Sequence, residues 1–406
     1  MGQVNLSASE FLSYAKNECD RIIATRRFLH QHPELSFKEY QTAAYIKTFL
    51  DNEGIPYTDG FAGTGIVALI KGVGEGPVVL LRADMDALPI IETNEVDYRS
   101  VNQGVMHACG HDVHTTCLLF SASLLNQTKS LWQGTIKLMF QPGEEVLPGG
   151  ASLMIAEGVL ENPKVERAIA LHVFPSMETG KVGFRKGIYM ASTDELYLSV
   201  KGKGGHAAMP DEYSNPILAL SEILLAYQNK FMRPGALKGT RGEDIPTVVA
   251  FGKLQALGAT NVIPELAKAE GTMRTMNEAW RKEIQLQLQE IASEIALKYG
   301  VAAKLEVKKG YPCVVNDADF TEICSKAASE LIGNDKVEEL PLRMTAEDFA
   351  FITQKVPSCF FRLGTGNSRK GTNAGVHTSN FDIDEDALPI GVATMAWLAI
   401  KALGAI

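Results

Sequence analysis

The sequence predicts an α/β fold in which a larger domain, built on a mixed sheet, carries an inserted domain with a ferredoxin-like order of elements. Short β-rich runs alternate with helix-like segments before about residue 188, and the order then changes over residues 189–311. A chain of 406 residues also exceeds what one hydrophobic core usually serves. We therefore expect one domain at 1–188 and 312–406 and a second at 189–311.

Four short apolar runs, each bounded by Gly, Pro or polar turns, predict the strands of the larger domain. They are GIVALI (65–70), PVVLLRA (77–83), GTIKLMFQP (134–142) and ERAIALHVF (166–174). Segments 11–32 and 114–128 have the length and apolar spacing of helices that pack on a sheet. We expect helices on both faces of that sheet.

The inserted domain is predicted from the order strand, helix, strand, strand, helix, strand, which is the ferredoxin-like split motif βαββαβ. The segments are ELYLSVKG (195–202), SNPILALSEILLAYQNKF (214–231), TVVAFGKLQA (247–256), LAKAEGTMRTM (266–276), AWRKEIQLQLQEIASEIALKYG (279–300) and AKLEVKKG (303–310). Together they make a self-contained unit of ordinary domain size.

After residue 312 the sequence predicts a return to the larger domain, with a helix, the strand PSCFFRLG (357–364), a Gly/Asn loop at 364–375 and a final helix. The apolar stretch 388–400 is interrupted by Lys401, well short of the roughly 20 residues that a membrane-spanning helix needs. We interpret it as a buried helix.

Composition and charge exclude several classes of protein. Apolar residues make up 46% and charged residues 21%, as in an ordinary soluble enzyme. A net charge of -9 without a block of Lys or Arg argues against nucleic acid as a partner. The N-terminal stretch lacks the basic start and apolar run of a secretory signal, and the six cysteines have no framework spacing. We expect a cytoplasmic protein that binds neither nucleic acid nor a membrane.

Compact polar motifs follow several of the predicted strands, where α/β sheets build their sites. They are RADMDALP (82–89), MHACGHDVH (106–114), FQPGEE (140–145), ALHVF (170–174) and GVHTSNFD (375–382). Their thiol, imidazole and carboxylate groups are the ligand types that zinc and neighbouring divalent metals accept. A lone histidine is more often an ordinary structural residue, and Cys109 alone is more often a small buried hydrophobe. The combination favours a metal site.

Glu144 and Glu145 are adjacent and follow a predicted strand and a Pro-Gly turn. Neighbouring residues of an extended chain point to opposite sides, so one dipeptide can supply both a metal ligand and a general base. The structural alternative is a solvated acidic pair at the surface.

These motifs together resemble those of the aminoacylase, carboxypeptidase and hippurate hydrolase family of dinuclear metal hydrolases. The resemblance covers essentially the whole chain and is closest to the branch that hydrolyses hippurate and auxin conjugates. It implies a zinc-peptidase-like catalytic domain with an inserted lid and dimerisation domain. The implied reaction is metal-dependent hydrolysis of the amide bond of an N-acyl amino acid or similar small conjugate, which gives a carboxylic acid and a free amino acid.

The resemblance also implies a set of site residues and two divalent ions. The metal ligands fall on Cys109, His111, Glu145, His172 and His377. Cys109 bridges the ions, Glu144 is the general base, and Asp86 orients a ligand. Much of the family has His-x-Asp where this chain has Asp84-Met85-Asp86, so the first ligand of that pattern is absent. The ions are zinc or manganese, with cobalt and nickel as alternatives.

The inserted domain contributes further candidates by the same resemblance. His206 in GKGGHAAMP reaches the active site of the partner subunit in a homodimer and stabilises the oxyanion. Asn261 in GATNVIP and Arg274 in GTMRT resemble residues that hold the substrate carboxylate, which suits the forked donors of Arg. Loop, turn and strand-edge roles are the structural alternatives for all three.

Other functions use the same residues. A dipeptidase or carboxypeptidase would act on short peptides at the same centre. A thiol hydrolase would use Cys109 as nucleophile, with His111 or His172 as base. A non-catalytic metal-binding module would need no general base. The acyl group and the amino acid depend on pocket shape, which motifs do not specify.

Overall fold

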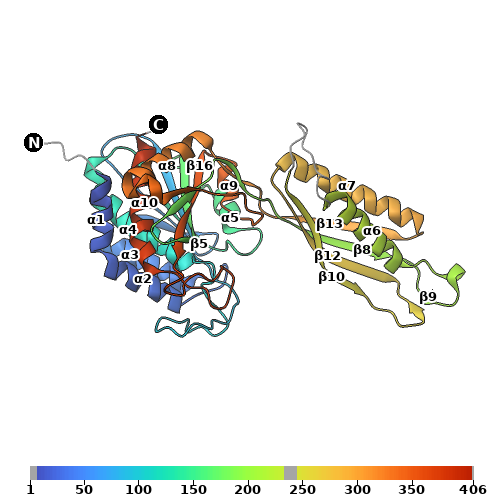
Figure 1. Cartoon of the computed structure of the whole chain (residues 1–406). Coiled ribbons are helices and arrows are strands. Elements are labelled where there is room, and N and C mark those ends of the chain that lie inside the picture. The colour runs from blue at the N-terminus through green and yellow to red at the C-terminus, as the bar shows by residue number, and fades with distance from the viewer. Residues whose placement is uncertain (1–6, 233–244, 405–406) are drawn as a thin grey trace, which may run out of the picture. The chain divides into compact units, whose positions relative to one another are not determined.

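The structure is a computed structural model that describes residues 7–232 and 245–404. The chain divides into two compact units (Figure 1), and each is described by itself. Unit 1 comprises 1–187, 315–341 and 348–406, and unit 2 comprises 188–314 and 342–347. The N-terminal stretch that lacks a secretory pattern begins outside the described residues.

Unit 1 contains a mixed eight-stranded sheet, in the order β1-β2-β4-β3-β5-β16-β6-β15. The strands are β1 (Tyr57–Phe61), β2 (Gly65–Lys71), β3 (Val78–Asp84), β4 (Thr135–Gln141), β5 (Arg167–Glu178), β6 (Val182–Phe184), β15 (Val337–Glu339) and β16 (Ser358–Gly366). β4, β3, β5 and β16 are neighbours and run parallel, whereas β1, β2 and β4 pair antiparallel. The predicted mixed sheet is confirmed.

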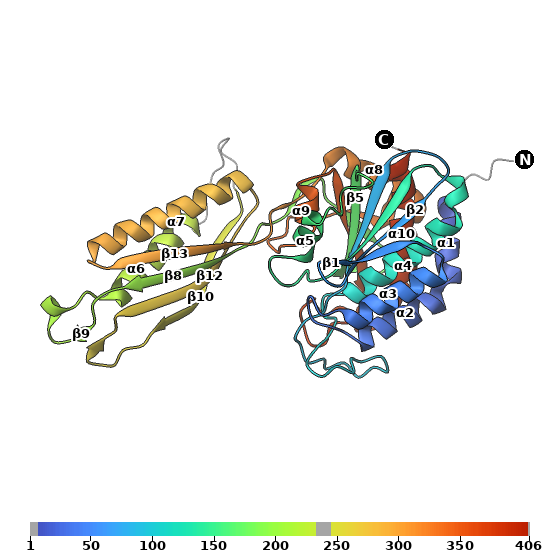
Figure 2. The ribbon, with the colours of Figure 1, turned by 180° about the vertical axis from the view of Figure 1, so that it is seen from behind.

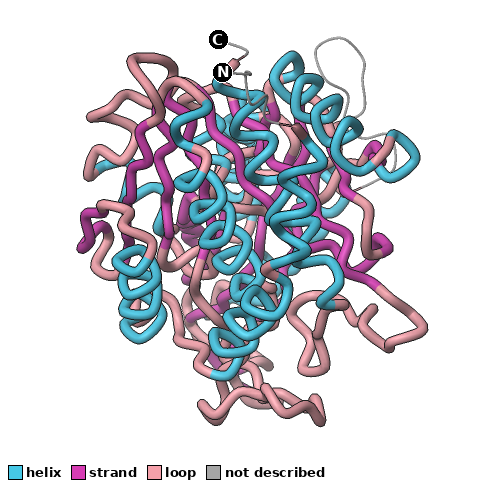
Figure 3. The backbone as a smooth tube through the Cα atoms, turned by 90° about the vertical axis from the view of Figure 1, so that its left-hand side faces the viewer, coloured by secondary structure: helices cyan, strands magenta, loops and turns pink. Residues whose placement is uncertain are grey.

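The central strands are near-continuous apolar runs because both faces of the sheet are covered. Every residue of β3 and β16 is buried. Figures 1 and 2 show α5 and α9 on the opposite side of the sheet from α4 and α10, as expected from the sequence. Figure 3 views the helical layer formed by α1, α4 and α10 from outside, with the strands behind it.

Eight α-helices and three short 3₁₀ turns are described in unit 1. The helices are α1 (Ala8–Asn17), α2 (Cys19–Gln31), α3 (Tyr40–Asn52), α4 (His111–Gln127), α5 (Gly150–Ala156), α8 (Ala318–Ile332), α9 (Ala350–Thr353) and α10 (Leu388–Leu403), and the 3₁₀ turns are Lys129–Leu131, Asn334–Lys336 and Glu385–Ala387. The prediction of one helix over 11–32 is wrong. Glu18 ends α1 and also begins α2, so each helix buries its own apolar stripe, with Phe11 in one and Ile22 in the other.

The final helix α10 is the apolar stretch that the sequence marks as buried, and this interpretation is confirmed. It packs against α4, α8 and α1 and over β5. By length and composition alone, Glu385–Leu403 resembles a membrane span, but 78% of that window is buried inside the protein. α10 is therefore a core helix of unit 1.

Unit 2 contains an antiparallel sheet in the order β10-β12-β8-β13, with two helices and its own hydrophobic core. Its elements are β8 (Asp194–Lys201), β9 (Gly205–His206), a 3₁₀ turn (Pro210–Glu212), α6 (Pro216–Phe231), β10 (Thr247–Ala256), β11 (Val262–Ile263), β12 (Leu266–Thr275), α7 (Glu278–Lys298) and β13 (Ala302–Lys309). The main elements follow the predicted order, and β9 and β11 add a small antiparallel pair. The strands β7 (Gly187–Met190) and β14 (Val314–Asn316) pair with each other.

Candidate metal centre

The ends of three adjacent parallel strands bring the predicted motifs of unit 1 together. β3 ends at Asp84, β4 leads into the turn that carries Glu144 and Glu145, and β5 contains His172. Because β4, β3 and β5 are neighbours in the sheet, these side chains share one edge.

Gly110 joins this edge to the helix that follows. It has φ +82, and a Cβ there would lie 2.6 Å from Cγ2 of Val173, so only glycine fits. Cys109 precedes this residue and His111 begins α4 directly after it. The backbone N–H of His377 donates to the carbonyl of Ala108 at 2.7 Å, which brings the 375–382 motif to the same place.

All five predicted ligands lie together. Sγ of Cys109 is 3.5 Å from Nε2 of His172, and Nε2 of His377 is 3.2 Å from Oε1 of Glu145. Cys109, His111 and His172 form one group with ligand atoms within 4.8 Å of one another, and Cys109, Glu145 and His377 form a second. Cys109 belongs to both groups, as a bridging ligand would.

The donor set fits divalent metal. Nε2 of His111 is buried and has no hydrogen-bond partner within residues 7–232 and 245–404, and it lies 3.9 Å from Oε1 of Glu145, which is in ion-pair contact with Nε2 of His377. Buried polar atoms are normally paired, so the free nitrogen of His111 indicates a ligand at this place. Burial, and then Glu145 and Glu144, raise the pKa of the Cys109 thiol well above its ordinary range. A cation at this place would bind the free nitrogen of His111, balance the charge of Glu145 and favour the thiolate form of Cys109. The sulfur, nitrogen and oxygen donors suit zinc and its neighbours.

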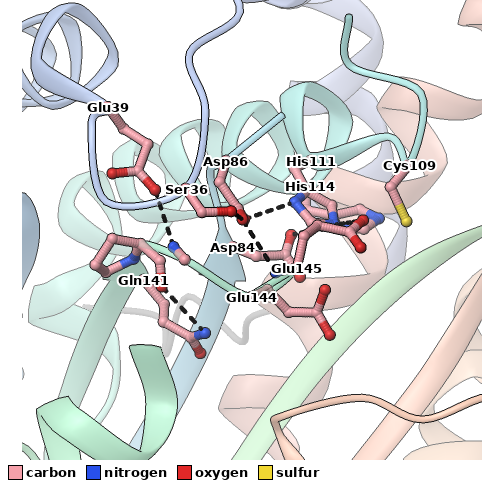
Figure 4. A network of polar contacts seen from close by, with 12 residues as sticks. Ser36, Glu39, Asp84, Asp86, Cys109, His111, His114, Gln141, Glu144 and Glu145 are labelled. Carbon is pink, nitrogen blue, oxygen red and sulfur yellow. Dashed lines mark hydrogen bonds and ion pairs between the residues drawn. The ribbon is translucent and has the colours of Figure 1, made fainter. Parts of the chain in front are cut away.

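Asp86 contacts Nδ1 of His111 and so holds the imidazole ring with Nε2 facing the other predicted ligands (Figure 4). Its Oδ1 lies 3.1 Å from Nδ1 of His111, and its Oδ2 accepts from the Glu145 N–H at 3.0 Å and from the Ser36 hydroxyl at 2.6 Å. Burial lowers the pKa of His111, but Asp84 and Asp86 more than reverse this and raise it to about 10. This is the geometry that an orienting role for Asp86 requires.

His114 supports the centre from α4. Its Nδ1 lies 2.5 Å from Oδ1 of Asp84, and its Nε2 accepts from the N–H of Val173 at 3.0 Å. Asp84, His111 and His114 are also close enough to hold an ion, but both nitrogens of His114 are already engaged. Burial opposes ionisation of Asp84, yet Arg82, His111 and His114 keep its pKa well below the ordinary range.

The Glu144-Glu145 pair lies in a turn after β4, so the expectation of an extended dipeptide with opposed side chains is wrong. Gly143, with φ +61, breaks the extended chain. Carboxylate oxygens of both residues lie within 4.8 Å of a His111 ring nitrogen, so both face the same space. Glu144 is buried, and its Oε1 accepts from the N–H of Asp348 at 3.3 Å.

The three remaining candidates lie in unit 2. His206 in β9 is exposed and is paired in register with Val262, and the N–H of Ala207 donates to the carbonyl of Asn261 at 2.9 Å. His206 and Asn261 are therefore neighbours. Arg274 in β12 is half-buried and donates to the carbonyl of Met344 at 3.1 Å, and burial lowers its pKa.

Sequence reasoning did not identify a buried ionic cluster next to the centre. Asp112, which follows His111, accepts from Nε of Arg26 at 2.9 Å and lies 2.8 Å from Nδ1 of His30. The other ring nitrogen of His30 lies 3.2 Å from Glu92. No local pattern in the segment HQHPEL (30–35) marks this cluster, because its partners are up to 82 residues away in the chain.

The fold and this donor set define a metal-dependent hydrolase with a dinuclear centre. Residues 80–401 match Peptidase family M20/M25/M40, and the chain belongs to that family.

Relatives of known name and structure cover nearly the whole chain. An N-acetylcysteine deacetylase of Bacillus subtilis is 37% identical over 94% of this chain and 97% of its own. Thermostable carboxypeptidase 2 of Saccharolobus solfataricus is 38% identical, over 94% of this chain and 95% of its own, and an IAA-amino acid hydrolase of Arabidopsis thaliana is 34% identical, over 97% and 89%. A crystal structure of a dinuclear metal-binding peptidase of the M20 family from Bacillus subtilis superimposes with a TM-score of 0.83 at 34% identity, covering 96% of this chain and 99% of that one.

Proposed function

We propose that this protein hydrolyses the amide bond of N-acyl amino acids or similar small conjugates, releasing a carboxylic acid and an amino acid. The observation that carries the proposal is the convergence of five metal-ligand side chains with a separate buried carboxylate, Glu144. A deacetylase of N-acetylcysteine and a hydrolase of IAA-amino acids are among the relatives, and both names describe this type of bond.

The two ions would be held by the thiolate, imidazole and carboxylate groups of the centre. In this assignment His111 and His172 would hold metal together with Cys109, and so would Glu145 and His377. When bound, the ions lower the pKa of a coordinated water and polarise the substrate carbonyl.

Glu144 acts as the general base and then the general acid. Its carboxylate takes a proton from the attacking water and returns it to the leaving nitrogen, while the N–H of Asp348 fixes the position of Oε1. The amide carbon gains the water oxygen as the C–N bond breaks, and the amine leaves with the proton from Glu144, so water is the only co-reactant that the reaction needs.

The inserted unit supplies the remaining groups in this proposal. His206 donates to the oxyanion from the partner subunit of a homodimer, and Asn261 and Arg274 bind the substrate carboxylate. The unit at 189–311 then acts as a lid that closes over the substrate and excludes water. His206 and Asn261 are neighbours, which supports assigning both to the same substrate-binding site.

The proposal also covers the kind of substrate and the location of the protein. The protein acts on a small molecule in the cytoplasm, with neither nucleic acid nor membrane as a partner, in keeping with its net charge of -9 and its scattered cysteines. The metal is zinc or manganese, with cobalt or nickel as alternatives.

A carboxypeptidase or dipeptidase activity on short peptides is the second candidate. Two thermostable carboxypeptidases of Saccharolobus solfataricus, 38% and 36% identical to this chain, favour it. The same base and ligands would serve, and only the group on the acyl side of the bond would differ.

A thiol hydrolase is disfavoured by the environment of Cys109. A nucleophilic cysteine needs a lowered pKa, whereas burial and the neighbouring carboxylates raise the pKa of this thiol. A non-catalytic module would have no use for Glu144 in the same space as the ligands.

A substrate panel tests the proposal. The holoenzyme, with its metal content measured, is assayed on N-acetyl, N-benzoyl and indole-acetyl amino acids and on dipeptides. We expect faster hydrolysis of the N-acyl amino acids. Preferential hydrolysis of dipeptides would favour the peptidase, and turnover that survives metal removal but not alkylation of Cys109 would favour the thiol hydrolase.

A further inference from the structure

Glu34 and Glu39, two glutamates near the start of α3, bind different parts of the chain. Glu39 occupies the N-cap position of α3, but its side chain makes no hydrogen bond to the helix. The helix is instead capped by Glu34, whose carboxylate accepts from the N–H groups of Gln41 and Thr42 at 2.9 Å. Since the first N–H groups of a helix need such partners, Glu34 does what an N-cap residue usually does. The carboxylate of Glu39 therefore does not cap the helix and can bind another part of the chain.

That carboxylate binds the turn that follows β4. Oε1 of Glu39 accepts from the N–H of Gly143 at 2.9 Å and from the N–H of Phe37 at 2.8 Å, and Oε2 accepts from the hydroxyl of Thr64 at 2.7 Å. Figure 4 shows Glu39 pointing toward the backbone beside Glu144 and Glu145. Glu39 is completely buried, so these bonds are shielded from water and hold the turn firmly.

The ring of Phe37 closes the same turn from outside. Gly143 has φ +61, and a Cβ on it would lie 2.3 Å from Cζ of Phe37. Phe37 itself has φ +63, a backbone conformation that bulky residues rarely adopt. Such conformations persist where the surroundings impose them, and they gather at functional sites. The segment 36–39 is therefore shaped to fit against Gly143.

Gly143 is fixed at both of its backbone groups. Its N–H is held by Glu39, and its carbonyl accepts from the N–H of Gly150 at 3.0 Å. The next residue is Glu144, whose Oε1 is in turn held by the N–H of Asp348. A shift of the Gly143 peptide would therefore move the Glu144 carboxylate relative to the ligands.

We propose that Glu39 is a positioning residue for the general base, which it places by binding the backbone of Gly143. This inference rests on the proposed function, because it takes Glu144 as the base. The hydrogen bonds of the Glu39 carboxylate go to Phe37, Thr64 and Gly143, so in this proposal Glu39 acts through the turn.

Three substitutions at Glu39 test the role. Glu39→Ala removes both acceptors, and Glu39→Asp shortens the side chain by one methylene. Either change should lower kcat by about 100-fold, which is the loss caused by a displacement of roughly 1 Å in an active site. KM and the content of two ions per subunit should stay at wild-type values. Glu39→Gln keeps an oxygen that accepts from both N–H groups, so its kcat should return close to wild type. If Glu39→Ala does not fold, the kcat of Glu39→Asp tests whether Glu39 positions the general base.

Glu34→Ala is the matched control. It removes a carboxylate that binds backbone N–H groups of the same helix but does not contact the turn. We expect a lower melting temperature with kcat unchanged. Equal losses of kcat in Glu34→Ala and Glu39→Ala, or a Glu39→Gln variant as slow as Glu39→Ala, would overturn the proposal.

Hydrogen–deuterium exchange separates this proposal from the proposed function. Peptides covering 141–146 should exchange faster in Glu39→Ala than in wild type or in Glu34→Ala, whatever substrate the enzyme uses. Unchanged exchange would overturn the positioning role even if the enzyme hydrolyses N-acyl amino acids. Faster exchange in a protein whose Glu144→Gln variant retains full turnover would instead reject Glu144 as the base.

Discussion

Oδ1 of Asp84 lies 2.5 Å from Nδ1 of His114, and the opposite nitrogen of the same ring accepts from the backbone N–H of Val173. Val173 follows His172, so the contact between Asp84 and His114 connects the end of β3 to the predicted ligand His172 in β5. Arg82 completes the arrangement, with a guanidinium nitrogen 2.6 Å from the other oxygen of Asp84. Asp84 thus contacts both Arg82 and His114 at the edge of the sheet where the predicted ligands gather.

His114→Ala should weaken metal binding because the residue next to His172 loses its partner. We expect affinity to fall by about 10- to 100-fold, as for other residues that orient ligands. Titration of the apoprotein with cobalt, followed by the absorption of its thiolate and d–d bands, measures this. Ser121→Ala, which alters another buried polar residue of α4, should leave the affinity unchanged. Equal affinities for His114→Ala and wild type would contradict the role.

Glu144→Gln should abolish turnover without loss of metal. An amide cannot accept the proton of the attacking water, so the rate should fall by about 10²- to 10⁴-fold. Initial rates and elemental analysis of the same preparation check both statements. Glu157→Gln, a glutamate of the same unit that accepts from the N–H of Ala62, is the control. A Glu144→Gln enzyme with full turnover would exclude this residue as the base.

Chelation should both inactivate and destabilise the protein. Without ions, the buried Nε2 of His111 has no hydrogen-bond partner within the described residues, and the pKa of the buried Cys109 thiol lies well above its ordinary range. Metal at 1,000 times its Kd stabilises a folded protein by about 4 kcal/mol, so the melting temperature should drop when the metal is removed and recover on reloading. Differential scanning calorimetry of the apoprotein and the reloaded protein gives the result. An apoprotein as stable as the holoprotein would indicate that the buried donors are compensated in another way.

His30 should make stability depend on pH. Burial and Arg26 lower the pKa of His30, but Asp112 and Glu92 outweigh them, so the pKa lies above its ordinary value of 6.5. A raised folded-state pKa gives stability that is fully present below 6.5 and is lost as the pH rises through the folded value. His30→Gln should therefore lower the free energy of unfolding by about 1–3 kcal/mol at low pH and by less at high pH.

Urea unfolding of His30→Gln at about pH 6 and about pH 9 measures this difference. His32→Gln is the control, since Nδ1 of His32 hydrogen-bonds to the carbonyl of Phe28 in the adjoining helix and no ion pair of His32 is seen among residues 7–232 and 245–404. An equal loss of stability at both pH values would show that the charge on His30 plays no part.

Mixing two inactive variants tests the assignment of His206 to the partner subunit. If His206 acts in trans, a hybrid dimer of His206→Ala and Glu144→Gln subunits contains one site in which both groups are intact. Co-refolded mixtures should then regain activity that neither variant shows alone. A mixture as inactive as its components, with hybrid dimers demonstrated by mass, would place His206 in its own subunit's site.

The sequence by itself determined the main strands of both units, the order of the main elements in unit 2 and the residue types of the centre. Strands such as β3 are recognisable because a strand buried on both faces must be a continuous apolar run. Cys109, His111, Glu145, His172 and His377 could be named because the short motifs that contain them resemble those of a known family of metal hydrolases. Local pattern carries this information directly.

Only the tertiary structure decided how those residues are held. Glu39 reaches Gly143 across 104 residues, and His30 reaches Asp112 across 82, so no local pattern marks either contact. The two carboxylates of Glu144 and Glu145 face one space after Gly143, which has a left-handed backbone conformation and contacts Glu39 and Phe37. Such contacts depend on the register and packing of distant segments, which a sequence motif does not record.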